Sequence, residues 1–273
     1  MQNFTLDSQY QISGIGSASG LVFKDNTLFI ISDNSTFLYQ YDISKQQLTK
    51  IPLVKNAQEN ILKKNKLDFE SITLKDNKLY LFGSGSTPKR EKRISFNLET
   101  KEIKEKSLKK LYKNLKQSIS ISDEDLNLEG AIYHNKEWLF FQRGNGSGSK
   151  NGIFKIDSEN NIKFIPIELP KIENIEATFT DAILVEDEIY FLAAAENTTS
   201  TYDDGEILGS MIGQLNATKM EVNFKQIIST KHKFEGLTLY KKNQDNIEFL
   251  LCEDNDTEVL ETTIYKLTLN TNN

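Results

Sequence analysis

Apolar and polar residues alternate along this chain in a unit that recurs five times. Each unit holds a polar or acidic turn, an apolar run, a short polar loop and a second apolar run. The clearest copies are residues 68–73 before 79–82, residues 127–132 before 138–141 and residues 233–238 before 248–251. Short apolar runs bounded by turn residues are typical of β-strands. The chain is therefore predicted to repeat one β-supersecondary unit.

The spacing of the units indicates a β-propeller. The first copy is residues 18–22 before 28–31, and the fourth is residues 179–183 before 189–192. The intervals between Gly20, Ser71, Gly130, Asp181 and Gly236 are 51, 59, 51 and 55 residues. A four-stranded blade takes roughly 40 to 50 residues. A third run follows in every unit and a fourth in all but the last, so the sequence predicts four-stranded blades.

The missing strand of the last unit is expected from the other end of the chain. Residues 4–12 are strand-like and precede the first unit. Pairing them into the last blade closes the ring and removes exposed sheet edges. We therefore predict an all-β fold, with five four-stranded blades forming one β-propeller domain over residues 1–273.

Residues 101–125 leave a six-bladed propeller as the rival interpretation. Within them, Leu108, Leu111, Tyr112 and Leu115 fall at the i, i+3, i+4, i+7 spacing of one helix face. We therefore favour a short helical insertion around residues 108–117. Residues 55–66 are expected to form another short helix or a loop.

The composition of the chain limits its expected domain organisation, binding partners and cellular location. Glycine and proline are scarce, at 14 and 4, and no linker divides the 273 residues, which favours a single ring. We expect this ring to be a monomer. The formal net charge of −6 disfavours nucleic acid as a partner. No apolar run is long enough for a membrane span and no signal-peptide pattern opens the chain, so we expect a cytoplasmic protein without membrane contact unless a leader has been removed.

Histidine and cysteine contribute little to the candidate chemistry. The single cysteine excludes an internal disulfide, and two histidines exclude a zinc site built from several of them. The basic stretch at residues 89–93 is predicted to be a solvated hairpin turn, with an anion site as the alternative. Any catalysis is therefore expected to depend on carboxylates.

Three glutamates occupy equivalent positions at the start of the first strand of their units. They are Glu70, Glu129 and Glu235. The first strand of every blade lines the central channel, so these side chains should converge. Converging carboxylates repel one another unless they are protonated or bind a hard cation such as calcium. The alternative is structural, with each carboxylate accepting backbone N–H bonds from the neighbouring blade.

Other polar residues extend this acidic channel. In the fourth unit either Thr180 or Asp181 corresponds to the glutamates, and in the first unit Ser19 takes that place. The second strands end in loops that carry Asp33, Arg143, Glu253 and Asp254. Arg143 is the one cation expected at this mouth, where it could orient an anionic substrate or pair with an acid.

Short motifs around these residues resemble a known type of propeller. They are Ser19-Gly20-Leu21 with Ile31-Ser32-Asp33-Asn34, Phe69-Glu70-Ser71-Ile72, Leu128-Glu129-Gly130-Ala131 and Phe234-Glu235-Gly236-Leu237. They resemble the SGL/EGL repeats of the phytase-like and SdiA-regulated propellers. That resemblance implies calcium held by acidic channel residues and, in true phytases, phosphomonoester hydrolysis. The chain departs from true phytases because it lacks their lysine and arginine cluster at the phosphate site.

The chain also resembles gluconolactonase-like propellers, which bind one divalent cation. Together the resemblances imply a calcium-dependent hydrolase acting on a small phosphoester or lactone, with Glu129 or Glu235 as base and Arg143 as a further catalytic residue. The expected metal ligands are Glu70, Glu129, Glu235, Asp181, Glu253, Asp254 and Asp33. The alternative function is a non-catalytic propeller that binds a ligand or protein, since this fold hosts many functions.

Overall fold

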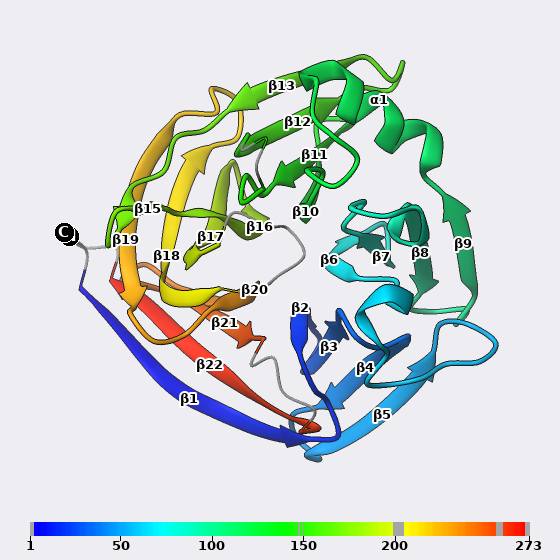
Figure 1. The fold of residues 1–273 in the computed structure, drawn as a ribbon. Coiled ribbons are helices and arrows are strands. Elements are labelled where there is room, and N and C mark those ends of the chain that lie inside the picture. Colours follow the sequence, from blue (N-terminus) through cyan, green and yellow to red (C-terminus); the bar gives the residue numbers. More distant parts are fainter. Residues whose placement is uncertain (1–2, 147, 149, 199–204, 255–258, 271–273) are drawn as a thin grey trace.

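Five antiparallel sheets of four strands each are arranged around a central axis, as Figure 1 shows. The computed structural model describes residues 3–146, 148, 150–198, 205–254 and 259–270. The predicted five-bladed propeller is confirmed, and the six-bladed rival is wrong because residues 101–125 contribute only the outer strand of blade 2 and a helix.

The blades follow one another along the chain, each running from the axis outward. Blades 1 and 2 are β2 (Ala18–Lys24), β3 (Thr27–Ser32), β4 (Phe37–Asp42) and β5 (Gln47–Pro52), then β6 (Phe69–Lys75), β7 (Lys78–Gly83), β8 (Lys92–Asn97) and β9 (Ile103–Ser107). Blades 3 and 4 are β10 (Leu128–His134), β11 (Glu137–Gln142), β12 (Gly152–Ile156) and β13 (Ile162–Pro166), then β16 (Thr178–Val185), β17 (Glu188–Asn197), β18 (Glu206–Asn216) and β19 (Val222–Ser229).

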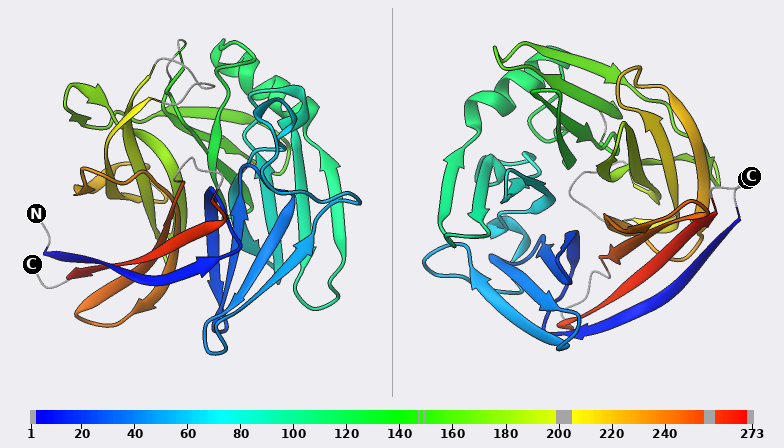
Figure 2. Two further views of the ribbon diagram at one scale, coloured as in Figure 1. Left: turned by 60° about the horizontal axis from the view of Figure 1, so that its bottom comes forward. Right: turned by 180° about the vertical axis from the view of Figure 1, so that it is seen from behind.

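Blade 5 joins the two ends of the chain. It contains β20 (Phe234–Lys242), β21 (Asn246–Glu253) and β22 (Glu261–Asn270), with β1 (Phe4–Ser13) as its outer strand. β1 pairs antiparallel with β22 from Phe4↔Leu269 to Ser13↔Glu261, and Figure 2 shows both strands together at the rim. The predicted closure by the N-terminal strand is confirmed.

Most of the insertions lie between blades, and one lies within blade 2. The helix α1 (Lys109–Ile119) connects blades 2 and 3, confirming the predicted helix, and it buries Tyr112, Leu115 and Ile119. It ends at Ser120, whose φ of 54° is left-handed. Residues 55–66 form mostly loop, with a short 3₁₀ turn η1 (Lys63–Asn65), and a second turn, η2 (Pro88–Arg90), precedes β8. The small hairpin β14 (Lys171–Ile172) and β15 (Ile175–Glu176) connects blades 3 and 4.

Membrane-spanning helices are absent from the part of the chain that the structure describes. None of its helices combines the length and the apolarity that crossing a bilayer requires.

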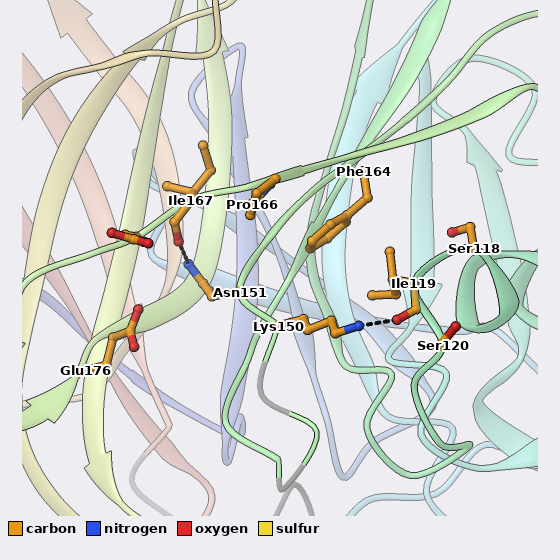
Figure 3. Close-up of a pocket in the computed structure, with 10 residues that line it drawn as sticks. Ser118, Ile119, Ser120, Lys150, Asn151, Phe164, Pro166, Ile167 and Glu176 are labelled. Atoms are coloured by element: carbon orange, nitrogen blue, oxygen red, sulfur yellow. Dashed lines mark hydrogen bonds between the residues drawn. The ribbon is translucent and has the colours of Figure 1, made fainter.

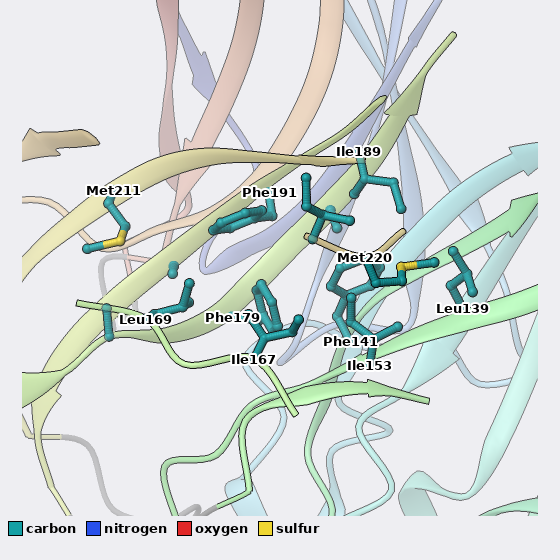
Figure 4. Close-up of a cluster of buried hydrophobic side chains, with 14 of the residues drawn as sticks. Leu139, Phe141, Ile153, Ile167, Leu169, Phe179, Ile189, Phe191, Met211 and Met220 are labelled. Carbon is teal, nitrogen blue, oxygen red and sulfur yellow. The ribbon is translucent and has the colours of Figure 1, made fainter. Parts of the chain in front are cut away.

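Apolar side chains fill the spaces between neighbouring blades. The cluster between blades 3 and 4, drawn in Figure 4, contains Phe141, Phe179 and Phe191. The Phe179 ring meets the other two edge-to-face, with centroids 5.1 Å away in both cases. Because Phe179 lies near the start of an inner strand and touches Phe141 of the preceding blade, the same contacts stabilise the ring and position the axis.

Replacing Phe179 by alanine should destabilise the protein strongly. The side chain is fully buried, and truncating such a phenylalanine costs about 3–5 kcal/mol through lost contacts and a cavity. Urea unfolding of Phe179→Ala measures this loss. Ile227→Ala, at a side chain that is 43 % exposed, is the control and should change the free energy of unfolding by less than about 1 kcal/mol. Similar losses in both variants would contradict this account.

Candidate functional site

Every inner strand carries a β-bulge close to its first residue, and the five bulge residues form the candidate site. In each blade one residue is skipped where the inner strand pairs with the second strand. The skipped residues are Ser19, Glu70, Glu129, Thr180 and Glu235. A bulge redirects its side chain, so equivalent residues from all five blades turn toward one end of the axis. This register makes Thr180, and not Asp181, the counterpart of the glutamates.

In blades 1 and 4 the bulge hydroxyls bind the next blade. Ser19 Oγ donates to the carbonyl of Phe69 at 2.6 Å, and Thr180 Oγ1 donates to the carbonyl of Phe234 at 2.7 Å. Asp181 accepts the N–H groups of Ala182 and Leu237, both at 2.7 Å. Both carboxylate oxygens of Asp181 therefore accept backbone hydrogen bonds. This is the structural alternative to metal binding that the sequence suggested for the channel carboxylates.

The bulge glutamates of blades 3 and 5 meet Arg143. Its guanidinium lies 3.3 Å from Glu129 and 4.0 Å from Glu235, which brings together the three residues expected to be catalytic. Glu196, at the end of β17, lies 2.6 Å from the same guanidinium. All four side chains are buried, and Glu129 is only 2 % exposed.

Lys233 completes this group, called here the Arg143 network. Its ammonium lies 2.9 Å from Glu235 and 3.8 Å from Glu196. The network thus spans blades 3, 4 and 5. Lys233 was not among the site residues predicted from the sequence, although it stands two residues before the bulge, where period-2 alternation puts a side chain on the same face.

Burial and neighbouring charges change the proton affinity of these glutamates. Burial raises the pKa of Glu129 to about 8, against the opposing effect of Arg143 and with a further increase from Glu235. Burial also raises the pKa of Glu235, against the effect of Lys233. Glu129 therefore holds its proton near neutral pH.

A second group, the acidic cluster, lies in blades 1 and 2. One carboxylate oxygen from each of Asp33, Asp68 and Glu70 falls within 4.8 Å of the others. Asp33 is 8 % exposed, and its buried Oδ1 has no hydrogen-bond partner. Lys66 pairs with the other oxygen of Asp33, and Arg90 lies 2.7 Å from Asp68. The cluster therefore retains an oxygen that could bind a cation.

Two carboxyl groups of the acidic cluster have raised pKa values. The pKa of Glu70 is well above its usual value because of burial and then the charge of Asp68. The pKa of Asp33 is likewise well above its usual value through burial and the charge of Asp254. A bound cation would relieve this repulsion.

The basic stretch at residues 89–93 differs from the predicted solvated turn. Arg90 and Glu91 are both buried. Arg90 pairs with Asp68, and Glu91 lies 3.1 Å from Lys116 of α1. The prediction was wrong for these two residues because their partners lie in other segments, which local polarity does not reveal.

The remaining expected ligands lie in blade 5. Glu253 is 2.6 Å from Nδ1 of His232 and accepts a hydrogen bond from the Tyr265 hydroxyl at 2.7 Å. Asp254 is buried, and its charge contributes to the raised pKa values of Asp33 and Glu235. Of the expected metal ligands, Asp33 and Glu70 lie together, and Asp68, which was not predicted, joins them. Glu129 and Glu235 lie instead against the cationic side chains of Arg143 and Lys233.

The protein is a five-bladed β-propeller in which charged residues lie together at one end of the axis. The chain belongs to a family of unknown function, DUF6929, whose sequence profile matches residues 14–269. No curated protein matches it. Membership of this family does not establish the predicted resemblance to phytase-like propellers, which stays a prediction.

Solved structures share the architecture at low identity. A luciferin-regenerating enzyme is 10 % identical with a TM-score of 0.51, covering 97 % of this chain and 95 % of its own. Glutaminyl cyclase from Myxococcus xanthus is 10 % identical with a TM-score of 0.54 and 98 % coverage of both chains. An exo-1,5-alpha-L-arabinanase from a bovine ruminal metagenomic library is 10 % identical with a TM-score of 0.53 and 93 % coverage of both. These likenesses show the fold alone.

Glu129→Gln should change how stability depends on pH. An unfolded glutamate loses its proton near pH 4.5, whereas folded Glu129 keeps it to about pH 8. Rising pH therefore favours unfolding across this window, by up to about 1.4 kcal/mol per pH unit for this group. Glutamine has no such proton to lose.

Melting temperatures from pH 5 to 8 test this expectation. The difference between variant and parent should move in favour of Glu129→Gln as the pH rises. Glu221→Gln, at an exposed residue, is the control and should give a constant difference. A pH-independent difference for Glu129→Gln would show that its carboxyl group is ionised throughout.

Proposed function

We propose that the protein is a divalent-cation-dependent hydrolase whose metal site is the acidic cluster. The observation that supports it is the convergence of Asp33, Asp68 and Glu70, together with the unpartnered buried oxygen of Asp33. A donor set of carboxylate oxygens suits a hard cation, and calcium accepts such ligands in irregular geometry. Calcium is therefore the proposed cation.

The charges of Glu129 and Glu235 act on Glu70, so the Arg143 network would provide the polar chemistry next to this metal site. A bound calcium ion would polarise a substrate oxygen and lower the pKa of water. Asn127 and Arg143 both donate to Oε1 of Glu129, at 2.7 and 3.3 Å, so a proton on Glu129 goes to Oε2. From there it can be donated to a leaving oxygen, while Glu235 accepts a proton from the attacking water.

The substrate class follows from the cations of the network. Arg143 and Lys233 suit an anionic group, and a guanidinium binds phosphate or carboxylate oxygens in pairs. A small phosphoester meets this description, and so does a lactone that opens to a carboxylate. Enzymes among the similar propellers support catalytic use of the fold, although the site must decide the activity.

A second candidate function is a non-catalytic binding propeller. Its support is that Glu129, Glu196 and Glu235 are buried against the cations Arg143 and Lys233, and that Asp181 is bound by backbone N–H groups. In that case the carboxylates stabilise the ring, and a ligand or protein would bind on one face. Calcium binding and turnover distinguish the two candidates.

Calcium should bind chelator-treated protein and raise its melting temperature. A ligand at 100 times its Kd adds about 2.7 kcal/mol of stability. Calorimetric titration should show this binding weakened about tenfold or more in Asp33→Asn and Glu70→Gln, since each loses a charged donor. Glu253→Gln should bind calcium normally, because Glu253 is held by His232 and Tyr265.

Activity is tested next with panels of phosphomonoesters and lactones, with calcium or with chelator. Turnover should require calcium and fall at least about a hundredfold in Glu129→Gln, the size of a general acid contribution. Calcium binding without turnover on any substrate would favour the non-catalytic candidate. Absence of both would refute the proposed hydrolase.

Lys66 should compete with the cation. Its ammonium pairs with Asp33 and lies among the charges of the acidic cluster. Lys66→Met should therefore tighten calcium binding about tenfold, as expected when one neighbouring positive charge is removed near a partly buried site. Lys89→Met is the matched control, because the partners of Lys89 within the described residues are the carbonyl of Lys64 and the side chain of Asn65, and neither is part of the acidic cluster. Weaker binding in Lys66→Met would mean that the lysine positions Asp33 instead.

A further inference from the structure

A cavity of about 570 Å³ lies on the outer flank of blade 3, formed by segments separate from the acidic cluster and the Arg143 network. Ser118 and Ile119 of α1 border one side, and Phe164, from the outermost strand of the blade, borders another. Figure 3 shows these side chains around the opening, with Glu176 at the opposite end. The volume lies within the range of about 300 to 1,000 Å³ typical of small-molecule sites.

Two additions to the propeller frame this cavity. One is the helix α1, and the other is the segment of β14 and β15 that connects blades 3 and 4. Asn151 fixes the wall between them, since its Nδ2 donates to the carbonyl of Ile167 and its Oδ1 accepts the N–H of Phe179, both at 3.0 Å. The cavity is therefore held open by the fold before any ligand arrives.

Charges around the cavity are predominantly negative. Glu168 and Glu176 line it, and within the described part of the chain neither has an ion pair or hydrogen bond through its side chain. The one lining lysine, Lys150, donates to the carbonyl of Ile119 and so caps the C-terminal end of α1. That end of a helix carries partial negative charge, which the lysine offsets. The two carboxylates are left to attract a cation.

Lys171 is the neighbouring cation that could weaken this field. It faces Glu176 across the β14 and β15 pair but does not line the cavity. No ion pair joins the two among the residues described. The apolar part of the wall comes from Phe164, Ile119 and Ile167. Phe164 also packs against Phe154, with ring centroids 4.8 Å apart, which fixes its orientation.

We infer that this cavity binds a small primary amine with an apolar body. The ammonium group would lie near Glu168 and Glu176, where it gains charge pairing and can stay partly hydrated. The apolar body would cover Phe164, burying surface that is now half-exposed. A carboxylic acid of the same size would meet repulsion from both glutamates. Charge complementarity therefore selects amines over acids.

The probe is 2-phenylethylamine, titrated calorimetrically into the full chain at low ionic strength. Saturable binding is expected, with a Kd at or below about 1 mM, as suits a fragment-sized ligand. 3-Phenylpropionate, of similar size and opposite charge, should not bind. Raising the salt concentration should weaken amine binding, because exposed charges are screened.

The double variant Glu168→Gln/Glu176→Gln should weaken amine binding about fivefold or more, in line with two partly exposed charge pairs. Glu173→Gln/Glu221→Gln removes the same charge at exposed positions outside the cavity and should bind like the parent. Melting temperatures establish that both variants are folded. Asp33→Asn should bind the amine normally, which separates this site from the proposed metal site.

Three results would overturn the inference. One is the lack of saturable binding of 2-phenylethylamine to the parent protein. Another is equal binding of 3-phenylpropionate, which would mean that the apolar wall alone attracts the ligand. The third is unchanged amine binding in the Glu168→Gln/Glu176→Gln variant, which would place the amine elsewhere.

Discussion

Electrostatic repulsion at the axis is the constraint on which the site depends. Five bulges direct five equivalent side chains to one end of the propeller, and three of these are glutamates. Charges interact strongly where water is excluded, and an isolated buried carboxylate is costly. The propeller geometry therefore obliges the chain to supply cations from elsewhere in the sequence.

The chain meets this requirement differently on the two sides of the axis. Around blades 3 to 5, Arg143 and Lys233 lie among three glutamates, and every member is buried. Such an arrangement adds little net stability, since desolvation offsets much of the attraction. In blades 1 and 2, Lys66 and Arg90 leave one oxygen of Asp33 without a partner. The site therefore has one half in which every carboxylate faces a cation and another half that can accept a further positive charge.

The fold could be predicted because its signals are local. Strand periodicity, the interval between units and the helical spacing of Leu108, Leu111, Tyr112 and Leu115 each depend on residues close in sequence. Symmetry then predicted the convergence of the glutamates. The motifs of three or four residues coincide with the bulges, so they encode the start of an inner strand and say little about activity.

The cations at the axis were harder to predict. Of these cations Lys233 left a usable signal, because it stands two residues before a bulge and lies beside Glu235, as the acid Asp68 does beside Glu70. Lys66 and Arg90 left none, since they belong to the connection between blades 1 and 2 and to a turn within blade 2. The path of such segments is set by tertiary contacts that no local pattern records.

The pairing of β1 with β22 also has a consequence for the order of assembly. Among the strands of this propeller β1 is synthesised first, but its partner β22 is synthesised last, so Phe4 must wait for a segment near Leu269. Blades 1 to 4 consist of consecutive strands and can form as hairpins while the chain is still growing. Blade 5 must bring together segments separated by nearly the whole chain, at a large cost in loop-closure entropy. We therefore expect the ring to close last, and the complete axis to exist only after β22 has been synthesised.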